Sequence, residues 1–370
     1  MHLAPGGVGT AQQRGARTNR WPSSGGPDRL GPVSDDLDIR PIDLLDPEQE
    51  GAARDWIGVH GSVQRELFGD QGSEWTLEEI RGFHQSSTSR RVALAAWSGG
   101  RLVGALEVRM PLADNLDLAL VWLSVHPEHR GRGVGGALLR AGESTAAAHG
   151  RRTLMGETEW PEGRSDESER FARQHGYAVG QTMLRSSMEL PGDRAALGAL
   201  AAAEDEYAVE TFVDHIPEEW LDDRAVLQQR MSTDAPLDDL ALEEEAWDAE
   251  RLRETFARTL ASGRRVVESV ARNVPTGRLV AFTTVAVSAG SPDLGFQQDT
   301  LVLKEHRGHG LGLRLKAANA LAVMDELPAV TAIRTWNAAS NEHMLAVNRR
   351  LGYRVDGYSR EWQKQAEGAE

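Results

Sequence analysis

The sequence predicts an α/β (α+β) protein in which one domain, built on a mixed and mostly antiparallel sheet with flanking helices, occurs twice. Three observations predict this. The chain has 370 residues, more than the usual size of one compact domain. Short apolar runs with strand character alternate with segments of helical periodicity. The same order of segments then recurs, with Arg130 and Arg307 marking equivalent points 177 residues apart.

The first copy is expected over residues 37–190, after a disordered tail at residues 1–36 that is rich in Gly, Pro, Ser and Arg. Alternating and β-branched runs predict its strands, and Ser98-Gly99-Gly100 predicts a hairpin between the second and third. The expected strands are residues 37–42, 91–96, 102–108, 116–125 and 153–158, and the expected helices are residues 47–68, residues 137–149 and a segment ending near Gly176.

A polar and Ala-rich connector at residues 191–205 precedes the second copy, which we expect over residues 206–370. Residues 266–271 and 279–287 form its hairpin pattern, and residues 300–303 lead into a second glycine-rich turn. The two copies also end alike, because the dipeptide Gly176-Tyr177 of the first matches Gly352-Tyr353 of the second. A tandem duplication is the simplest explanation.

Composition narrows the possible partners. The 41 Lys and Arg against 56 Asp and Glu give a net charge of −15, so nucleic acid and anionic membranes are unlikely partners and a cationic amine, small or peptidic, is favoured. No apolar run is long enough to span a bilayer. The absence of cysteine excludes disulfides, thiolate metal sites and a cysteine nucleophile, and it fits a cytoplasmic location.

Residues 125–135 align with residues 302–312 without a gap, and each segment is a glycine-rich turn between a strand and a helix. Such a turn collects unpaired backbone N–H groups at the positive end of a helix, which suits a phosphate group. A Walker A loop is excluded because no Gly-Lys-Ser/Thr follows. The dinucleotide fingerprint is matched formally by Gly131, Gly133 and Gly136, but the second copy has Leu313 in place of the third glycine.

The two turns resemble motif A of the GNAT superfamily of N-acetyltransferases, whose signature is Arg or Gln, two residues, Gly, one residue, and Gly or Ala. Both copies contain it, and the first also has the approach Val125-x-Pro127. The resemblance implies two tandem GNAT domains that hold acetyl-CoA, the acyl donor, between splayed fourth and fifth strands. The cofactor-binding residues it implies are Val125, Arg130, Gly131, Arg132, Gly133, Val134, Gly135, Gly136, Val302, Leu303, Arg307, Gly308, His309, Gly310, Leu311, Gly312, Asn337 and Asn341.

The expected chemistry is direct attack of an amine on a thioester, which requires loss of a proton from an ammonium of pKa about 10.4. Asp299, on the strand before the second turn, is the first candidate for the base, and the first copy has Trp122 there. Many GNAT enzymes carry a Tyr on the last helix as the acid, but here those positions are Ala172 and Asn348. Asp299, Asn337 and Asn341 therefore favour the C-terminal copy as the catalytic one.

The leading hypothesis is an acetyl-CoA-dependent N-acetyltransferase acting on a primary amine, with the acceptor's identity, acyl chain length and oligomeric state left open. A non-catalytic acyl-CoA-binding or sensing protein is the alternative, because the usual acid is missing. A dinucleotide-binding oxidoreductase is a third possibility. We expect no metal, since the histidines at positions 126, 129, 306 and 309 lack an accompanying carboxylate cluster.

Overall fold

The structure, a computed structural model, describes residues 36–203, 205–234 and 236–365, so nearly all of the expected tail lies outside the described residues. The first half has six strands and four α-helices in the described ranges. They are β1 (Asp38–Ile42), α1 (Glu50–Phe68), α2 (Leu77–His84), β2 (Ser89–Ser98), β3 (Arg101–Pro111), β4 (Leu118–Val125), α3 (Val134–Ala148), β5 (Thr153–Pro161), α4 (Glu169–Gln174) and β6 (Ala178–Glu189), with 3-10 turns η1 (Pro47–Gln49), η2 (Gly69–Gln71) and η3 (Pro127–His129).

The second half repeats this order after helix α5 (Arg194–Ala201), which lies in the predicted connector. Its elements are β7 (Tyr207–Val213), η4 (Glu218–Trp220), α6 (Leu221–Asp234), α7 (Ala249–Ala261), β8 (Arg265–Asn273), β9 (Leu279–Ser288), β10 (Ser291–Val302), η5 (Lys304–His306), α8 (Leu311–Glu326), β11 (Ala332–Ala338), α9 (Glu342–Leu351) and β12 (Arg354–Gln365). Helix α3 begins three residues before its predicted start because left-handed Gly133 is its N-cap.

All twelve strands form one continuous sheet, in the order β1-β2-β3-β4-β5-β12-β6-β11-β10-β9-β8-β7. Only the pairs β4/β5 and β10/β11 are parallel, and every other neighbouring pair is antiparallel. The order reads the same from both ends when the two halves are exchanged. The predicted class, a mostly antiparallel sheet flanked by helices and present in two copies, is confirmed.

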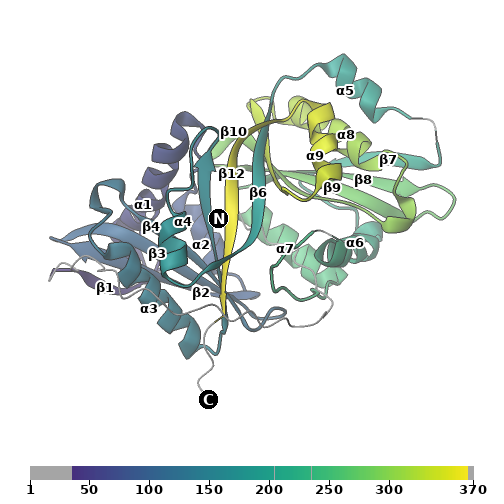
Figure 1. The fold of residues 1–370 in the computed structure, drawn as a ribbon. Helices are drawn as coiled ribbons and strands as arrows, with labels where there is room; N and C mark the ends of the chain where they lie inside the picture. The colour runs from purple at the N-terminus through teal and green to yellow at the C-terminus, as the bar shows by residue number, and fades with distance from the viewer. Residues whose placement is uncertain (1–35, 204, 235, 366–370) are drawn as a thin grey trace, which may run out of the picture.

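The two halves exchange their last strands. β6 comes from the first half but pairs with β11 of the second, whereas β12 comes from the second half and pairs with β5 of the first. β6 and β12 also pair with each other along most of their length, side by side at the centre of the molecule (Figure 1). The two halves are therefore joined by main-chain hydrogen bonds through the middle of the sheet.

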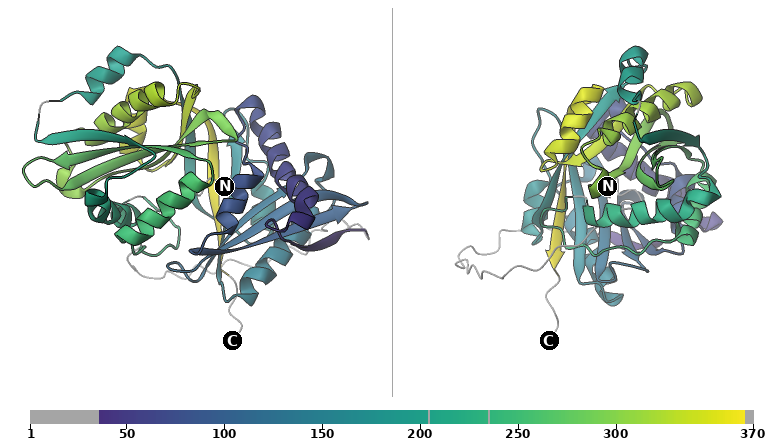
Figure 2. Two further views of the ribbon diagram at one scale, coloured as in Figure 1. Left: turned by 180° about the vertical axis from the view of Figure 1, so that it is seen from behind. Right: turned by 90° about the vertical axis from the view of Figure 1, so that its right-hand side faces the viewer.

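Helices cover both faces of each half, as two further views show (Figure 2). In the first half, α3 packs on one face of β2 to β4, and α1 with α2 packs on the opposite face. In the second half, α8 and α6 take the corresponding places. No helix within the described ranges combines the length and the apolar character needed to cross a bilayer.

The α1/α2 face of the first half meets the second half at a second contact. Arg264, one residue before β8, donates through Nε to Glu79 of α2 at 3.0 Å, and both side chains are buried. The segment between α6 and α7 packs Leu240 and Leu242 against apolar residues of β4 and β5. The backbone N–H of Glu243 also donates to Asn115 Oδ1 at 2.7 Å. This contact, together with the exchanged strands, encloses space between the halves.

We predict that Trp362→Ala destabilises the first half, although residue 362 belongs to the second. Trp362 lies on β12, is 2% exposed, packs in the core of the first half and donates through Nε1 to Thr158 at 2.9 Å. Truncation of such a side chain should lower the free energy of unfolding by about 3–5 kcal/mol. Urea titration would measure it, with Trp362→Phe as the milder control. Equal stability of Trp362→Ala and the unsubstituted protein would contradict the exchange.

Candidate active site

A gap opens in each half where two parallel strands diverge. β4 and β5 pair only from Leu118–Thr153 to Val121–Gly156, after which β4 continues to Val125 and β5 turns to pair with β12. β10 and β11 likewise pair over only three residues, ending at Phe296–Arg334. Within the described ranges, the two strands of each pair form no further ladder with each other beyond these points. Each half therefore offers a wedge between strands that ends at a glycine-rich turn.

The first glycine-rich turn has the geometry of an anion site. Gly131 and Gly133 adopt positive φ angles of 73° and 80°, which residues with a side chain rarely adopt. No side chain caps the start of α3, so its first N–H groups face the turn without a capping partner. Arg130 donates through Nε to the carbonyl of Val125 and forms an ion pair with Glu66 of α1 at 2.6 Å. The turn is therefore braced against β4 and α1.

The second glycine-rich turn has the same backbone conformation. Gly308 and Gly310 have positive φ angles, and Arg307 donates through Nε to the carbonyl of Val302 at 3.0 Å. Its guanidinium pairs with Asp234 of α6 at 2.8 Å, as Arg130 pairs with Glu66 in the first half. The two motifs are thus equivalent in local structure. What differs is the space around them.

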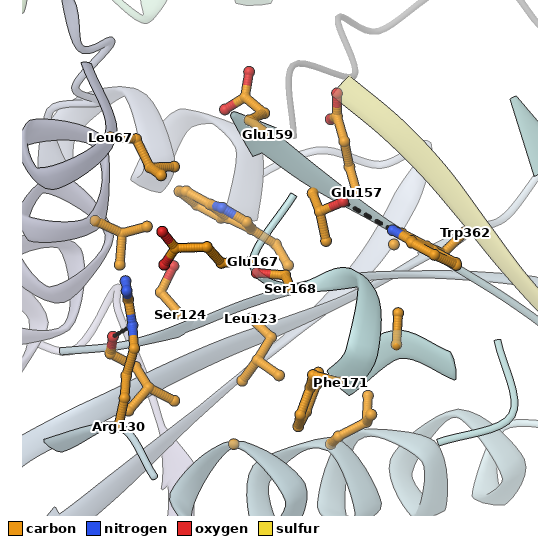
Figure 3. A pocket seen from close by; sticks show the side chains of 18 of the residues that line it. Leu67, Leu123, Ser124, Arg130, Glu157, Glu159, Glu167, Ser168, Phe171 and Trp362 are labelled. Atoms are coloured by element: carbon orange, nitrogen blue, oxygen red, sulfur yellow. Dashed lines mark hydrogen bonds between the residues drawn. The ribbon is translucent and has the colours of Figure 1, made fainter. Parts of the chain in front are cut away.

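In the first half, the wedge opens into a cavity of about 1350 Å³ (Figure 3). It runs from the glycine turn and α4, past the diverging strands, to α1 on the other face of the sheet. This exceeds the usual range of small-molecule sites, about 300–1000 Å³. Of the predicted cofactor residues, those lining it are Val125, Arg130, Gly131, Gly133, Val134, Gly135 and Gly136; Arg132 does not line it. Trp362 of β12 is the contribution of the second half.

Two carboxylates stand on β5 at the side of this cavity that faces α1. Glu159 accepts a hydrogen bond from Gln64 Nε2 of α1 at 2.7 Å. Burial raises the pKa of Glu157 above its ordinary value, and neighbouring Glu159 raises it further. In Figure 3 both residues project from the strand that borders Trp362. A carboxylate whose pKa is raised towards neutrality is a suitable proton acceptor.

A histidine and a serine add a neutral polar pair to the same wall. His60 Nδ1 lies 2.8 Å from Ser124 Oγ, one residue before Val125, and its ring stacks on Trp122 with centroids 3.6 Å apart. Burial lowers the pKa of His60 to about 3, so the ring is uncharged at neutral pH. Its Nε2 atom is buried and has no hydrogen-bond partner within the described residues. The pair can orient a substrate by hydrogen bonding. With so low a pKa, however, His60 is too weak a base to take a proton from the substrate.

The second half encloses a much smaller cavity, about 280 Å³, between its wedge and the first half. A chain of buried polar side chains stands in this wedge. Lys316 of α8 donates to Asn348 Oδ1 at 2.5 Å, and Asn348 donates to Asn337 Oδ1 at 2.6 Å. Burial lowers the pKa of Lys316 to about 7. The equivalent position to Lys316 in α3 is Leu139, and Leu139 lines the large cavity.

The structure places the predicted site residues of the second half in two separate locations. Asp299, Asn337 and Asn341 line the smaller cavity, whereas the second glycine turn, from Val302 to Gly312, lines neither of the two cavities. Asn341 is the N-cap of α9 and accepts from the N–H of Met344. Asp299 accepts from Gln228 Nε2 at 2.9 Å, and burial raises its pKa to about 6.

Tyr207 of β7 packs against the second glycine turn. Its hydroxyl lies 3.0 Å from Nδ1 of His306, and its ring contacts that of His309 at 5.2 Å between centroids. Asp205 follows the connector and binds Arg314 of α8 through both carboxylate oxygens, at 2.9 and 2.8 Å. Residues at the end of the connector thus contact the part of the second half that corresponds to the anion site of the first.

Two further expectations concern the chemistry at the first turn. Ala172 lines the large cavity where many relatives place an acid, and Tyr177 donates to Glu143, which together with burial raises its pKa well above the ordinary range. Tyr177 is therefore a poor acid.

His126, Glu128 and His129 bring three donor atoms within 4.8 Å of one another, so a carboxylate does accompany the first pair of histidines. The absence of a metal remains a prediction.

Sequence reasoning did not select Glu157, Glu159, His60 or Ser124. One signal was present, because Glu157 and Glu159 are spaced by two along a strand that begins with Thr153, Leu154 and Met155. Charged residues spaced by two on a central strand share one face, and that face must be a cavity or a polar interface. His60 carried no comparable signal, since its place depends on how α1 crosses β4.

Comparisons with known proteins agree with this geometry. The model of the acetyltransferase (GNAT) family matches residues 61–177. A tandem GNAT protein from the clavulanic acid biosynthesis pathway is 25% identical with a TM-score of 0.75, covering 90% of this chain and 100% of that chain. A GCN5-related N-acetyltransferase from Sphaerobacter thermophilus is 18% identical with a TM-score of 0.65, covering 92% and 99%. A search of curated protein sequences gives no match.

The fold, the glycine-rich turn at the end of a splayed strand pair and the family match together define a GNAT protein. The order of elements occurs twice in the chain, and a tandem GNAT protein is matched along its whole length. Both observations point to two GNAT-like domains in one chain. Residues 61–177 match the GNAT family, and the chain along its length has the fold of a tandem GNAT protein, as the sequence predicted.

We predict that Asp299→Asn stabilises the protein at neutral pH. A carboxyl whose folded pKa is about 6, against 3.8 in its ordinary state, binds its proton more tightly when folded, so its contribution to stability falls as the pH rises between those values. Asparagine retains an acceptor for Gln228 and has no charge to bury. The Tm of the variant should exceed that of the unsubstituted protein above about pH 6, and the gap should close below about pH 4. A difference in Tm between the variant and the unsubstituted protein that does not change with pH would contradict the raised pKa.

Proposed function

We propose that the protein is an N-acyltransferase that binds acetyl-CoA, or another short acyl-CoA, in the cavity of its first half and transfers the acyl group to an amine in the cytoplasm. The observation that carries this proposal is the cavity of about 1350 Å³ that joins the first glycine turn to the α1 face of the sheet. An acyl donor at the turn and an acceptor near α1 would meet at the diverging strands.

The first half fits the cofactor in three respects. The uncapped N–H groups at the start of α3 and the amides around Gly131 would hold the pyrophosphate, with Arg130 adding positive charge. The free edge of β4 towards Val125 would pair with the amides of the pantetheine arm. Phe171 of α4 and the small residue Gly135 would border the arm from the other side.

The chemistry follows from the groups on the α1 side. The amine nitrogen attacks the thioester carbonyl carbon, the carbon–sulfur bond breaks, and the CoA thiolate leaves. The proton of the attacking amine passes to Glu157, directly or through water, because its raised pKa brings it closer to neutral pH. A thiolate with a pKa of about 8.5 can leave without a dedicated acid, so Ala172 on α4 does not prevent transfer.

The sequence favoured the second half as the catalytic one. The larger cavity lies in the first half, and we therefore propose that the first half is catalytic. The Lys316, Asn348 and Asn337 network stands in the second wedge, and Tyr207 packs against the second turn. We propose that the second half completes the fold of the first and walls the acceptor side. The alternative, an acyl-CoA-binding protein without catalysis, is supported by Ala172 and Asn348 at positions where relatives place an acid, and by Trp122 at the position that corresponds to Asp299.

Substitutions in the equivalent turns test which half binds the cofactor. A Cβ at Gly135 would lie 3.4 Å from Phe171 and 3.5 Å from Val125, so Gly135→Val should narrow the cleft and raise the Kd for acetyl-CoA by about tenfold or more. A Cβ at Gly312 would meet only Val302, at 3.9 Å, which makes Gly312→Val the matched control with unchanged affinity. Titration calorimetry would measure both, and the reverse pattern would assign the cofactor to the second half.

Substitution of the proposed base tests the chemistry. Glu157→Gln preserves the size of the side chain and removes its proton affinity, so kcat with an amine acceptor should fall by about 10²–10⁴ while the Kd for acetyl-CoA is retained. Release of free CoA thiol with a panel of amines measures the rate. Asp299→Asn is the corresponding substitution in the second half. Loss of turnover in Asp299→Asn, with Glu157→Gln fully active, would move the chemistry to the second half.

A further inference from the structure

One arginine in the space between the halves has no hydrogen-bond partner among the described residues. Arg109, on β3, lines the smaller cavity and is partly buried. Its side chain forms no hydrogen bond or ion pair within the described residues. Burial and the neighbouring charge of Arg91 lower its pKa to about 10, against the opposing effect of the Glu107 and Glu245 carboxylates, so Arg109 is still charged at neutral pH. A half-buried guanidinium normally has a carboxylate or several carbonyl oxygens as partners, because its desolvation is costly.

The two carboxylates that attract Arg109 electrostatically, Glu107 and Glu245, direct their hydrogen bonds to other residues. Glu107 is taken by His84 at 2.8 Å and by Arg91 at 2.5 Å. Glu245 approaches the cavity from the segment before α7, but its Oε2 accepts from Trp247 Nε1 at 2.8 Å, and burial raises its pKa. The other cations of the cavity also have partners, since Arg264 is paired with Glu79 and Lys316 is bonded to Asn348. Asp299 accepts from Gln228.

The smaller cavity adjoins the large one. Trp75, Gly156 and Glu157 line both cavities, so the wall between them is the part of β5 where it diverges from β4. Two acidic side chains stand at this wall, because Glu157 faces Glu361 directly across the β5/β12 pair. Burial and Glu157 raise the pKa of Glu361 to about 8, so Glu361 is mostly protonated at neutral pH and the acidic pair shares its proton. Acidic groups thus stand at the end next to the acyl-transfer cleft, and Arg109 lines the same cavity from β3.

The register of the sheet gives the separation of these groups. Arg109 pairs with Leu120 of β4, Leu120 pairs with Met155 of β5, and Glu157 is two residues further along β5. Two strand spacings across the sheet and two residues along a strand place the Cα atoms of Arg109 and Glu157 about 12 Å apart. Both side chains lie on the α1/α2 face, like Glu107 and Glu159 two residues away on the same strands, and both line the cavity. The remaining gap is that of a short aliphatic chain.

We propose that the smaller cavity is the acceptor subsite, and that the acceptor is an amine carrying a carboxylate, an ω-amino acid in its simplest form. Its carboxylate binds Arg109, and its ammonium group lies at Glu157 beside the acyl donor. A volume of about 280 Å³ suits a molecule of this size. The inference rests on the proposed function of the first half, and it makes Arg109 a residue that determines specificity and takes no part in the chemistry.

The test uses pairs of acceptors that differ only in the anionic group. δ-Aminovalerate and γ-aminobutyrate are compared with their uncharged amides in the acetyl-CoA assay with the full chain. We expect kcat/KM to be about tenfold or more higher for the acids, as for a charge-assisted hydrogen bond. Arg109→Met should remove this preference and leave the rate with the amides, and Arg109→Lys should restore part of it. Arg90→Met, an exposed arginine on the neighbouring strand, is the control that keeps the preference.

A binding measurement separates this inference from the proposed function. The protein is saturated with CoA, which lacks the acyl group, and binding of δ-aminovalerate and its amide is measured by calorimetry. Tighter binding of the acid, lost in Arg109→Met, supports the subsite even if no acyl transfer is detected. Equal affinity for acid and amide, or a preference that survives in Arg109→Met, overturns the subsite even if the protein acetylates other amines. Failure to bind CoA at all would overturn the proposed function and the inference together.

Discussion

The antiparallel pairing of β6 with β12 is the interaction on which the rest of the structure depends. Because each of these strands pairs with strands of the other half, neither half of the sheet is complete without the strand that the other half supplies. The exchange places Trp362 in the core of the first half and sets Glu361 beside Glu157. The exchange also fixes the position of the α1/α2 face of the first half relative to the corresponding α6 face of the second half. The smaller cavity lies between these two faces. A tandem duplication has become one folding unit with a single central sheet.

Divergence between the halves is concentrated in the wedge between the parallel strands. Both glycine turns retain their backbone conformation and their braced arginines, Arg130 and Arg307. The side chains that face the wedge have changed, from Leu139 and Ala172 in the first half to Lys316 and Asn348 in the second. Small and apolar residues leave room for an extended ligand, whereas a buried lysine and two amides satisfy one another. This difference is the basis of our proposal that the first half binds the cofactor and the second half supports it.

Much of the fold could be predicted from the sequence, because its signals are local. The hairpins, the glycine turns and the repeat follow from residue periodicity, glycine positions and an alignment without gaps. The exchange of β6 and β12 could not, since a strand pattern such as that of residues 178–189 is the same whichever sheet accepts it. The burial of Lys316 was also hidden, because a lysine on a helix ordinarily faces solvent. Candidate residues chosen by motif thus included both turns, and only the space around them distinguishes the halves.

The measurement that tests this account most directly is the crystal structure of the full chain grown with saturating acetyl-CoA. The account predicts one cofactor molecule per chain, its pyrophosphate at the amides of Gly131 and Gly133, its pantetheine arm along β4 and its thioester facing Glu157. The second wedge should keep the hydrogen bonds of Lys316, Asn348 and Asn337. A cofactor molecule at the turn of Gly308 and Gly310, with the first cavity empty, would contradict it.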